Sequence, residues 1–278
     1  MEARKATRFE FGKNWLRFLS VLNQERISEA ERSLKDMLGV DHLDGKSFLD
    51  IGSGSGLFSL AARRLSARVH SFDYDPESVE CTQELKRRYF PHDSNWTIEQ
   101  GDVLNVDYVK SLGQFDVVYS WGVLHHTGAM WQALENVGSL LEEGGKLYIS
   151  IYNDQGGASL LWASVKKFYN RSSKLVKGII LVGVGVYWET RSGLSRLIRF
   201  KNPLPFKRWA ERKRDRGMSV WHDLVDWVGG YPFEVAKPEE IFDFYRKKGF
   251  HLMKLKTCAG GIGCNEFVFI KRENADTT

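Results

Sequence analysis

The fold of this chain is decided by residues 49–56, which read Leu49-Asp50-Ile51-Gly52-Ser53-Gly54-Ser55-Gly56. This stretch joins a short apolar segment, predicted as a strand over residues 47–51, to a segment predicted as a helix over residues 57–65. Glycines suit such a turn because its backbone adopts positive φ and because a ligand can then approach the backbone closely. The loop therefore predicts a ligand-binding site at the carboxyl end of a strand.

Three details around the glycine loop indicate which ligand it binds. The dinucleotide fingerprint G-x-G-x-x-G would need a third glycine at position 57, which is Leu57. Asp50 at the strand tip suits a cationic ligand rather than a pyrophosphate. Asp73 ends the next predicted strand, where an acid can bind the ribose hydroxyls of a nucleoside. A nucleoside with a positively charged, phosphate-free tail describes S-adenosylmethionine.

Predicted strands and helices alternate along most of the chain. After residues 47–51, apolar segments predict further strands over residues 68–73, 96–100, 115–120, 146–151, 251–257 and 266–271. Helical patterns lie between most of them, and residues 142–145 are predicted as a turn before the fifth strand. This alternation is typical of a sheet covered by helices on both faces. We therefore predict an α/β fold with a doubly wound, mostly parallel seven-stranded sheet.

The strand–helix alternation stops after Asn153 and resumes near Pro238, so an insertion separates two parts of the predicted sheet domain. We predict an N-terminal helical cap, a cofactor-binding α/β core, a basic helical lid, the end of the α/β core and a short tail. Their boundaries are residues 1–45, 46–153, 154–232, 233–272 and 273–278.

Four further motifs follow the glycine loop in a consistent order and spacing. They are Ser71-Phe72-Asp73, Gly101-Asp102-Val103, Phe115-Asp116-Val117-Val118-Tyr119-Ser120-Trp121-Gly122-Val123-Leu124-His125-His126 and Gly144-Gly145-Lys146-Leu147. With the glycine loop they cover about residues 46–151 and make the chain resemble class I S-adenosylmethionine-dependent methyltransferases. The resemblance implies a Rossmann-like methyltransferase fold. The aromatic N-terminal segment makes the chain similar, more loosely, to the ubiquinone-type small-molecule methylases.

The resemblance implies where S-adenosyl-L-methionine binds. The glycine loop would hold the methionine part of the cofactor, and Asp73 the ribose. Asp102 would meet the adenine amino group, with Val103 beside the ring. Because an aromatic face attracts a sulfonium cation, we expect Trp15 to close over the cofactor. The complete set expected to bind the cofactor is Asp50, Gly52, Ser53, Gly54, Gly56, Asp73, Tyr74, Asp102, Val103, Trp121 and Trp15.

Candidate catalytic residues lie where an open α/β sheet places its site, beyond the carboxyl ends of the strands. An oxygen or nitrogen acceptor needs a general base, and His125 or His126 after the fourth strand could supply it. We choose His126, together with Tyr152 at the end of the fifth strand. His222 and Asp226 share one helix face at spacing i, i+4, and we expect part of the acceptor pocket there. The alternative for each of these residues is an ordinary packing or capping role.

The predicted lid concentrates the positive charge of the chain. Residues 156–218 hold 15 Lys and Arg against 3 acids, a local charge of +12, while the whole chain carries +5. Such a block indicates an anionic partner. The partner could be an anionic small substrate or an anionic membrane bound peripherally by residues 174–191, whose apolar centre suits an interfacial helix. A solvated charged lid is the alternative; nucleic acid is least favoured, because no RNA-binding module is recognisable.

Cysteine content favours a reducing compartment. Three cysteines (Cys81, Cys258 and Cys264) are too few and too scattered for a disulfide scaffold, so we expect a cytoplasmic protein, with peripheral membrane attachment if residues 174–191 bind lipid. The first nine residues predict no signal peptide. The spacing of Cys258 and Cys264 is wrong for a zinc site, so we expect no metal. The oligomeric state is not predicted.

Together these features predict a biosynthetic S-adenosylmethionine-dependent methyltransferase. Its acceptor is expected to be an oxygen or nitrogen atom of a small molecule, anionic or lipid-like in character. Because a fold does not determine a reaction, a second hypothesis stays open. The same pocket could consume S-adenosylmethionine by intramolecular cyclisation or a lyase reaction, releasing methylthioadenosine.

Overall fold

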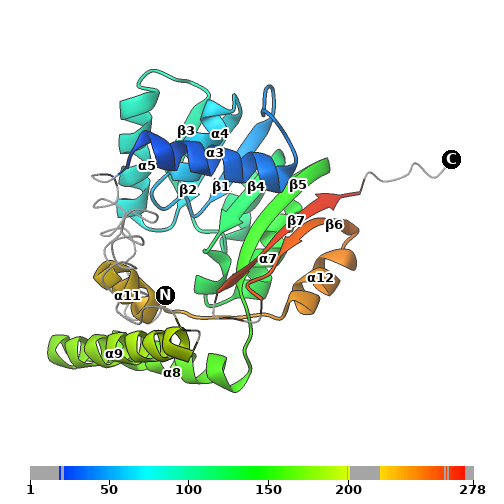
Figure 1. Ribbon diagram of the computed structural model, residues 1–278. Helices are drawn as coiled ribbons and strands as arrows, with labels where there is room; N and C mark the ends of the chain where they lie inside the picture. Colours follow the sequence, from blue (N-terminus) through cyan, green and yellow to red (C-terminus); the bar gives the residue numbers. More distant parts are fainter. Residues whose placement is uncertain are drawn as a thin grey trace. The chain divides into compact units, whose positions relative to one another are not determined.

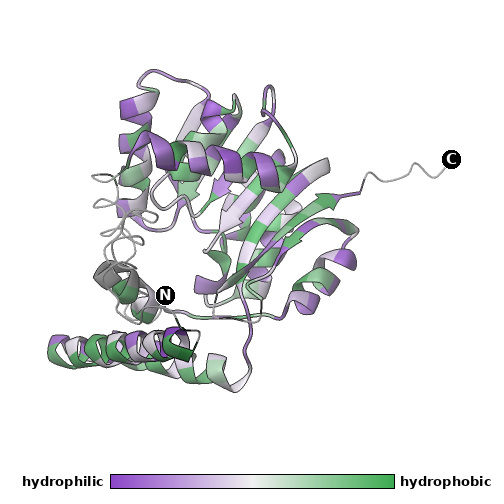
Figure 2. Ribbon diagram, in the orientation of Figure 1, coloured by the Kyte–Doolittle hydropathy of each residue, from purple (hydrophilic) through white to green (hydrophobic). Residues whose placement is uncertain are grey.

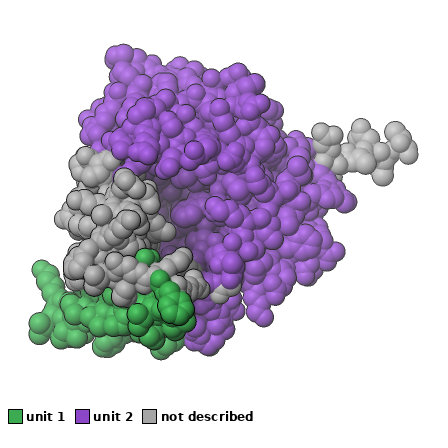
Figure 3. All heavy atoms as spheres, in the orientation of Figure 1, with its two compact units in different colours: residues 1–9, 160–232 green, residues 10–159, 233–278 purple. Residues whose placement is uncertain are grey.

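The structure is a computed structural model that describes Leu19, residues 22–198, Phe200, residues 220–259, Gly261 and residues 263–272; the side chains of residues 220–223 and 226 are outside this description. The chain divides into two compact units (Figure 3). Within the described residues, the α/β unit covers residues 19–159 and 233–272, and the helical unit covers residues 160–232. The division into five parts made from the sequence stays a prediction.

The α/β unit is built on one seven-stranded sheet with the strand order β3-β2-β1-β4-β5-β7-β6 (Figure 1). Its strands are β1 (Ser47–Ile51), β2 (Arg68–Asp73), β3 (Trp96–Gln100), β4 (Phe115–Trp121), β5 (Leu141–Tyr152), β6 (Phe250–Lys256) and β7 (Cys264–Lys271). All pairs are parallel except those of β7, which runs antiparallel to both β5 and β6. The predicted doubly wound, mostly parallel sheet is confirmed.

Helices cover both faces of the sheet, because its central strands are apolar on both sides. Phe48 and Leu49 are neighbours on β1, so they point to opposite faces, and both are fully buried. Phe48 belongs to a cluster with α3 and α4, whereas Leu49 belongs to a cluster with α7 and α12. The helices of this unit are α3 (Gln24–Leu38), α4 (Leu57–Arg64), α5 (Pro76–Tyr89), α6 (Val106–Ser111), the 3-10 helix η1 (Leu124–His126), α7 (Met130–Ser139) and α12 (Pro238–Arg246).

One predicted boundary is wrong. β5 begins at Leu141, not at residue 146, and includes the residues predicted as a turn. The prediction failed because the turn is an interruption within the ladder. Phe115 pairs with Leu141 and Val117 with Lys146, so residues 142–145 bulge out of register.

The helical unit consists of α8 (Gly157–Arg171), which begins in the α/β unit, α9 (Lys174–Ile198) and α11 (Val220–Gly229). The ring of Trp227 lies 4.4 Å from that of Trp162 and 4.5 Å from that of Trp188. The fully buried Lys166 donates a hydrogen bond from Nζ to the Trp227 carbonyl, and burial lowers the pKa of Lys166 to about 7. Asn170 binds the Gly229 carbonyl at 2.7 Å, so two side chains of α8 cap the carboxyl end of α11. Within the described residues, no helix has both the length and the apolar character needed to cross a membrane.

Candidate active site

The glycine loop between β1 and α4 is held close to two other loops. Gly52, Gly54 and Gly56 have φ of 76°, 55° and 77°, a conformation that favours glycine. The Gly52 amide donates to the Phe72 carbonyl at 2.8 Å, which ties the loop to β2. A Cβ on Gly52 would lie 2.4 Å from a methyl group of Val123, in the loop after β4. Glycine is therefore required at position 52 by space as well as by backbone conformation.

Asp73 fixes the glycine loop. Its Oδ2 accepts the Gly54 amide at 2.9 Å and its Oδ1 accepts the Asp75 amide at 2.9 Å. Its expected contact with the ribose hydroxyls of the cofactor stays a prediction. Asp73 is partly exposed at the carboxyl end of β2, where such a ligand would be expected.

Asp50, which is expected to bind the cofactor, is buried in a network of hydrogen bonds at the end of β1. It is 2% exposed and accepts a hydrogen bond from the Ser59 hydroxyl. Ser71 in turn donates to Ser59 at 2.8 Å, and the Trp96 indole donates to Ser71 at 2.9 Å. Burial raises the pKa of Asp50 to about 7, in spite of the hydrogen bonds from Ser59. The structure thus shows Asp50 at the end of a buried chain of hydrogen bonds that links β3, β2 and α4 to β1. Its contact with the cofactor stays a prediction.

The expected adenine-side residues lie in the turn after β3. Asp102 is partly exposed and accepts the Leu104 amide at 2.9 Å, and Val103 is buried. The carbonyl of Val103 accepts the Asn136 side-chain amide from α7 at 2.8 Å, a tie that the sequence analysis did not identify. Gly101 is packed against Tyr108, since a Cβ there would lie 2.3 Å from the Tyr108 ring.

The remaining expected cofactor residues divide into two groups. Tyr74 and Trp121 are exposed, at 37% and 44%, next to the carboxyl ends of β2 and β4. Ser53 is buried and its hydroxyl lies 2.9 Å from that of Thr82 on α5. Trp15 lies outside the described residues.

A cluster of rings lies at the carboxyl ends of β4 and β5. The ring centroid of Tyr152 lies 4.0 Å from that of His125, 5.5 Å from that of His126 and 5.2 Å from that of Phe233. His126 is 7% exposed and Tyr152 is partly exposed. The structure therefore brings together two of the four predicted catalytic residues. The side chains of the other two, His222 and Asp226, lie outside the described part of the chain.

His125 has a structural role that distinguishes it from His126. It is fully buried, and its Nδ1 accepts the backbone amide of Tyr152 at 3.3 Å. Because that nitrogen accepts, a neutral ring carries its proton on Nε2. His125 thus joins the loop after β4 to the end of β5, which leaves His126 as the better candidate for a base.

Glu234 is a site residue that the sequence analysis missed. Its two carboxylate oxygens accept the Met130 amide at 3.2 and 3.1 Å, and its own amide donates to the His125 carbonyl at 2.9 Å. The residue at the start of α7, Ala129, has no side chain that could cap the helix. Glu234 supplies the cap from 104 residues away, and no local pattern could have indicated this.

The loop between β6 and β7 also borders the end of β5. The Asn153 amide donates to the Gly263 carbonyl at 2.9 Å, and the buried Asn265 donates to Asn153 Oδ1 at 3.0 Å. Cys264 pairs with Tyr152 across the antiparallel ladder. In the part of the chain that the structure describes, no group of three His, Cys, Asp or Glu side chains could hold a metal ion.

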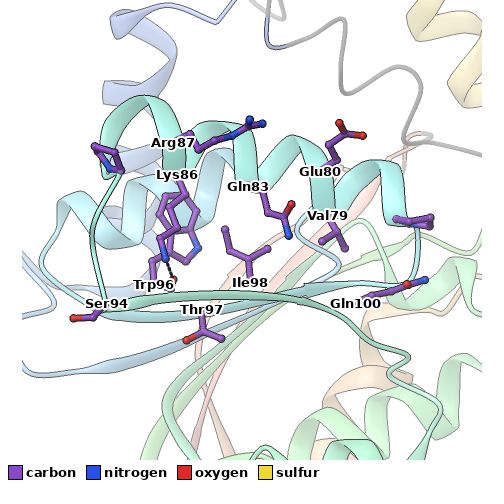
Figure 4. Close-up of a pocket in the computed structure, with 12 residues that line it drawn as sticks. Val79, Glu80, Gln83, Lys86, Arg87, Ser94, Trp96, Thr97, Ile98 and Gln100 are labelled. Carbon is purple, nitrogen blue, oxygen red and sulfur yellow. Dashed lines mark hydrogen bonds between the residues drawn. The ribbon is translucent and has the colours of Figure 1, made fainter.

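A hollow of about 900 Å³ lies elsewhere on the α/β unit, between α5 and the edge strand β3 (Figure 4). The side chains of Val79, Gln83 and Ile98 lie between the helix and the strand, and Lys86 Nζ donates to the Trp96 carbonyl at 2.5 Å. No predicted cofactor or catalytic residue lines this hollow. It is therefore separate from the site at the carboxyl ends of β4 and β5.

The sheet has one antiparallel strand, β7, and it carries the glycine loop, Asp73 and the turn after β3. This combination defines the class I S-adenosylmethionine-dependent methyltransferase fold. Residues 49–147 match the family described as a methyltransferase domain. The chain therefore carries a class I methyltransferase domain that is loosely similar to the ubiquinone methylases. S-adenosylmethionine is the cofactor of this class, and the close-packed glycine loop with its positive φ values fits it.

Sequence relatives are ubiquinone biosynthesis O-methyltransferases. The protein of Xanthomonas euvesicatoria pv. vesicatoria is 32% identical over 120 residues, which is 40% of this chain and 45% of the relative. The protein of Coxiella burnetii is 24% identical over 135 residues, or 49% of this chain and 53% of the relative. The chain thus matches about half the length of these curated relatives.

Solved structures with a similar fold are also methyltransferases. Magnesium protoporphyrin IX methyltransferase from Synechocystis PCC 6803, with bound SAH, has a TM-score of 0.52 and 15% identity, covering 89% of this chain and 83% of that one. PKMT2 from Rickettsia typhi, in complex with AdoHcy, has a TM-score of 0.55 and 13% identity, covering 87% and 52%. At these identities the likeness shows the fold.

Replacement of Gly52 by alanine tests the close packing of the glycine loop. The added Cβ would push the loop away from Val123, so we expect the Kd for S-adenosylmethionine, measured by calorimetry, to rise at least about tenfold. Gly113→Ala is a matched control, because Gly113 has φ of 77° but nothing within 4 Å of its Cβ position. The control should lose about 1–2 kcal/mol of stability and bind the cofactor normally. Equal Kd values for both variants would contradict this explanation.

The raised pKa of Asp50 predicts a pH dependence of stability. An aspartate whose pKa is about 3.9 when unfolded and about 7 when folded takes up a proton on folding between these values, so stability falls as pH rises through this window. Asp50→Asn removes this effect and keeps an acceptor for Ser59. From pH 5 to pH 8 we expect the wild type to lose roughly 2 kcal/mol relative to this variant in urea unfolding.

Asp107→Asn, which removes an exposed acid of α6, controls for the loss of one negative charge. If wild type and Asp50→Asn kept a constant difference in unfolding free energy from pH 5 to pH 8, Asp50 would have to be ionised in the folded protein.

Proposed function

We propose that this protein transfers a methyl group from S-adenosylmethionine to an oxygen or nitrogen atom of a small molecule. The observation that carries this proposal is the position of Val123. Its side chain packs against Gly52 of the glycine loop, and its carbonyl accepts the His126 amide at 2.9 Å. One residue thus joins the cofactor loop to the turn that carries the candidate base.

The residues at this site would act mainly by aligning the cofactor with the acceptor. Bound S-adenosylmethionine would supply an activated methyl group. Val123 and Gly52 would hold the cofactor loop against the turn of His126, while Tyr152 and Phe233 would form one wall for the acceptor and exclude water. His126 would accept the proton that the acceptor loses from its oxygen or nitrogen.

The acceptor class is proposed from charge. The helical unit is strongly basic, which favours an acceptor that carries a phosphate, a carboxylate or another anionic group. The ubiquinone biosynthesis relatives act, by their names, on oxygen atoms of intermediates of that pathway. They support an O-acceptor without identifying it.

The reaction is tested by mass spectrometry of the adenosine-containing products. Purified protein is incubated with S-adenosylmethionine alone and with panels of anionic phenols, carboxylic acids and amines. We expect S-adenosylhomocysteine to form only when an acceptor is present. Enzyme-dependent methylthioadenosine without any acceptor would show that S-adenosylmethionine is itself the substrate, and the methyl-transfer proposal would fall.

His126→Asn tests the proposed base with the acceptor that this screen identifies. We expect kcat to fall about 100-fold or more, with the Kd for S-adenosylmethionine changed less than about twofold, because the side chain acts on the acceptor. His251→Asn, on the exposed part of β6, is the control and should keep full activity. A normal kcat in His126→Asn would remove His126 from the mechanism.

A further inference from the structure

The long helix α9 exposes a row of large apolar side chains. Leu175, Ile179, Val182 and Val186 are 76%, 64%, 56% and 57% exposed. Their spacing of four, three and four residues places them on one helix face. Leu197, which is 59% exposed, continues the same face one turn after Gly193. We call these five residues the α9 stripe.

The opposite face of α9 already forms the core of the helical unit. Leu181 is 5% exposed and packs with Leu224 and Val228 of α11, and Trp188 packs against Trp227. The α9 stripe is therefore additional to what the fold of this unit requires. Contiguous apolar surface of this kind marks an interaction site, because each Å² left in water costs roughly 25 cal/mol.

The helix α8 also exposes large apolar side chains. Leu160, Leu161 and Phe168 are 73%, 62% and 61% exposed. Figure 2 shows hydrophobic residues, coloured green, along both α8 and α9. Exposed apolar side chains are therefore a feature of both helices.

Positive charge accompanies the apolar surface. Between residues 157 and 198 there are seven basic residues and one acid, Glu189. The basic residues are Lys166, Lys167, Arg171, Lys174, Lys177, Arg191 and Arg196, and all except Lys166 reach the surface. At 100° per residue, Arg196 borders the α9 stripe, whereas Lys174, Lys177 and Arg191 lie toward the other face of the helix.

We propose that α8 and α9 lie in the interfacial region of an anionic lipid bilayer, with the α9 stripe facing the acyl chains and the exposed bases of the two helices lying among the headgroups. An apolar helix face with Lys and Arg on the polar side is the pattern of an interfacial helix, and bases near an anionic surface strengthen its binding. The positive charge favours a lipid surface over a second copy of the chain as the partner, because self-association would bring two strongly basic surfaces together. The proposal is independent of the reaction proposed above.

Co-sedimentation with vesicles tests the proposal. Full-length protein is mixed with vesicles of phosphatidylcholine, with and without phosphatidylglycerol, at low and high salt. We expect binding to the phosphatidylglycerol vesicles at low salt, and weaker binding at high salt because the bases are then screened. The triple variant Leu175→Ser, Ile179→Ser and Val186→Ser should bind at least about tenfold more weakly and keep its circular dichroism, since these side chains are exposed.

A matched control removes exposed apolar residues elsewhere. Met253→Ser with Leu255→Ser, on β6 of the α/β unit, should leave vesicle binding unchanged. Absence of binding to phosphatidylglycerol vesicles at low salt would overturn the proposal, as would equal binding by the stripe variant. Self-association that the stripe variant abolishes, without vesicle binding, would show instead that the surface joins two copies. None of these outcomes depends on whether the protein transfers methyl groups.

Discussion

The carboxylate of Asp73 is the interaction on which the candidate site depends. It binds the Gly54 amide of the loop after β1 and the Asp75 amide at the start of α5, so one side chain at the end of β2 sets the shape of two loops. Parallel strands make this arrangement possible, because their carboxyl ends meet at one edge of the sheet. The residue expected to bind ribose therefore also builds the loop expected to hold the rest of the cofactor.

The buried polar chain below that loop serves a different purpose. In this chain Trp96 donates a hydrogen bond to Ser71, Ser71 donates to Ser59, and Ser59 donates to Asp50. Burial raises the pKa of Asp50 to about 7. A buried carboxylate that is partly protonated at neutral pH costs less than a buried charge, and its bonds give α4 a fixed position relative to β1. From the sequence, the acid at the strand tip suggested a ligand contact. That contact stays a prediction, and the structure adds that Asp50 supports the helix that follows the glycine loop.

Local patterns were sufficient to predict most of the sheet, because most strands contain a short run of apolar residues next to a turn or a helix start. The bulge at residues 142–145 was missed, since a turn sequence looks the same whether it ends a ladder or interrupts one. Residues of the site that come from distant parts of the chain were also missed. Glu234 caps α7, Asn136 binds the Val103 carbonyl, and Asn265 orients Asn153, and each of these ties depends on folded geometry that periodicity does not contain.

Val123 connects the two parts of the site that the proposed methyl transfer requires. Its side chain sets how closely the loop of Gly52 can approach, and its carbonyl sets the turn that carries His126. His125 then fastens that turn to the backbone of Tyr152, and Glu234 fastens it to α7. Methyl transfer requires a methyl group and an acceptor to meet in line, within a few tenths of an ångström. In this protein the side chain of Val123 contacts the cofactor loop and its carbonyl holds the turn of the proposed base, so both would move together and their alignment would be kept.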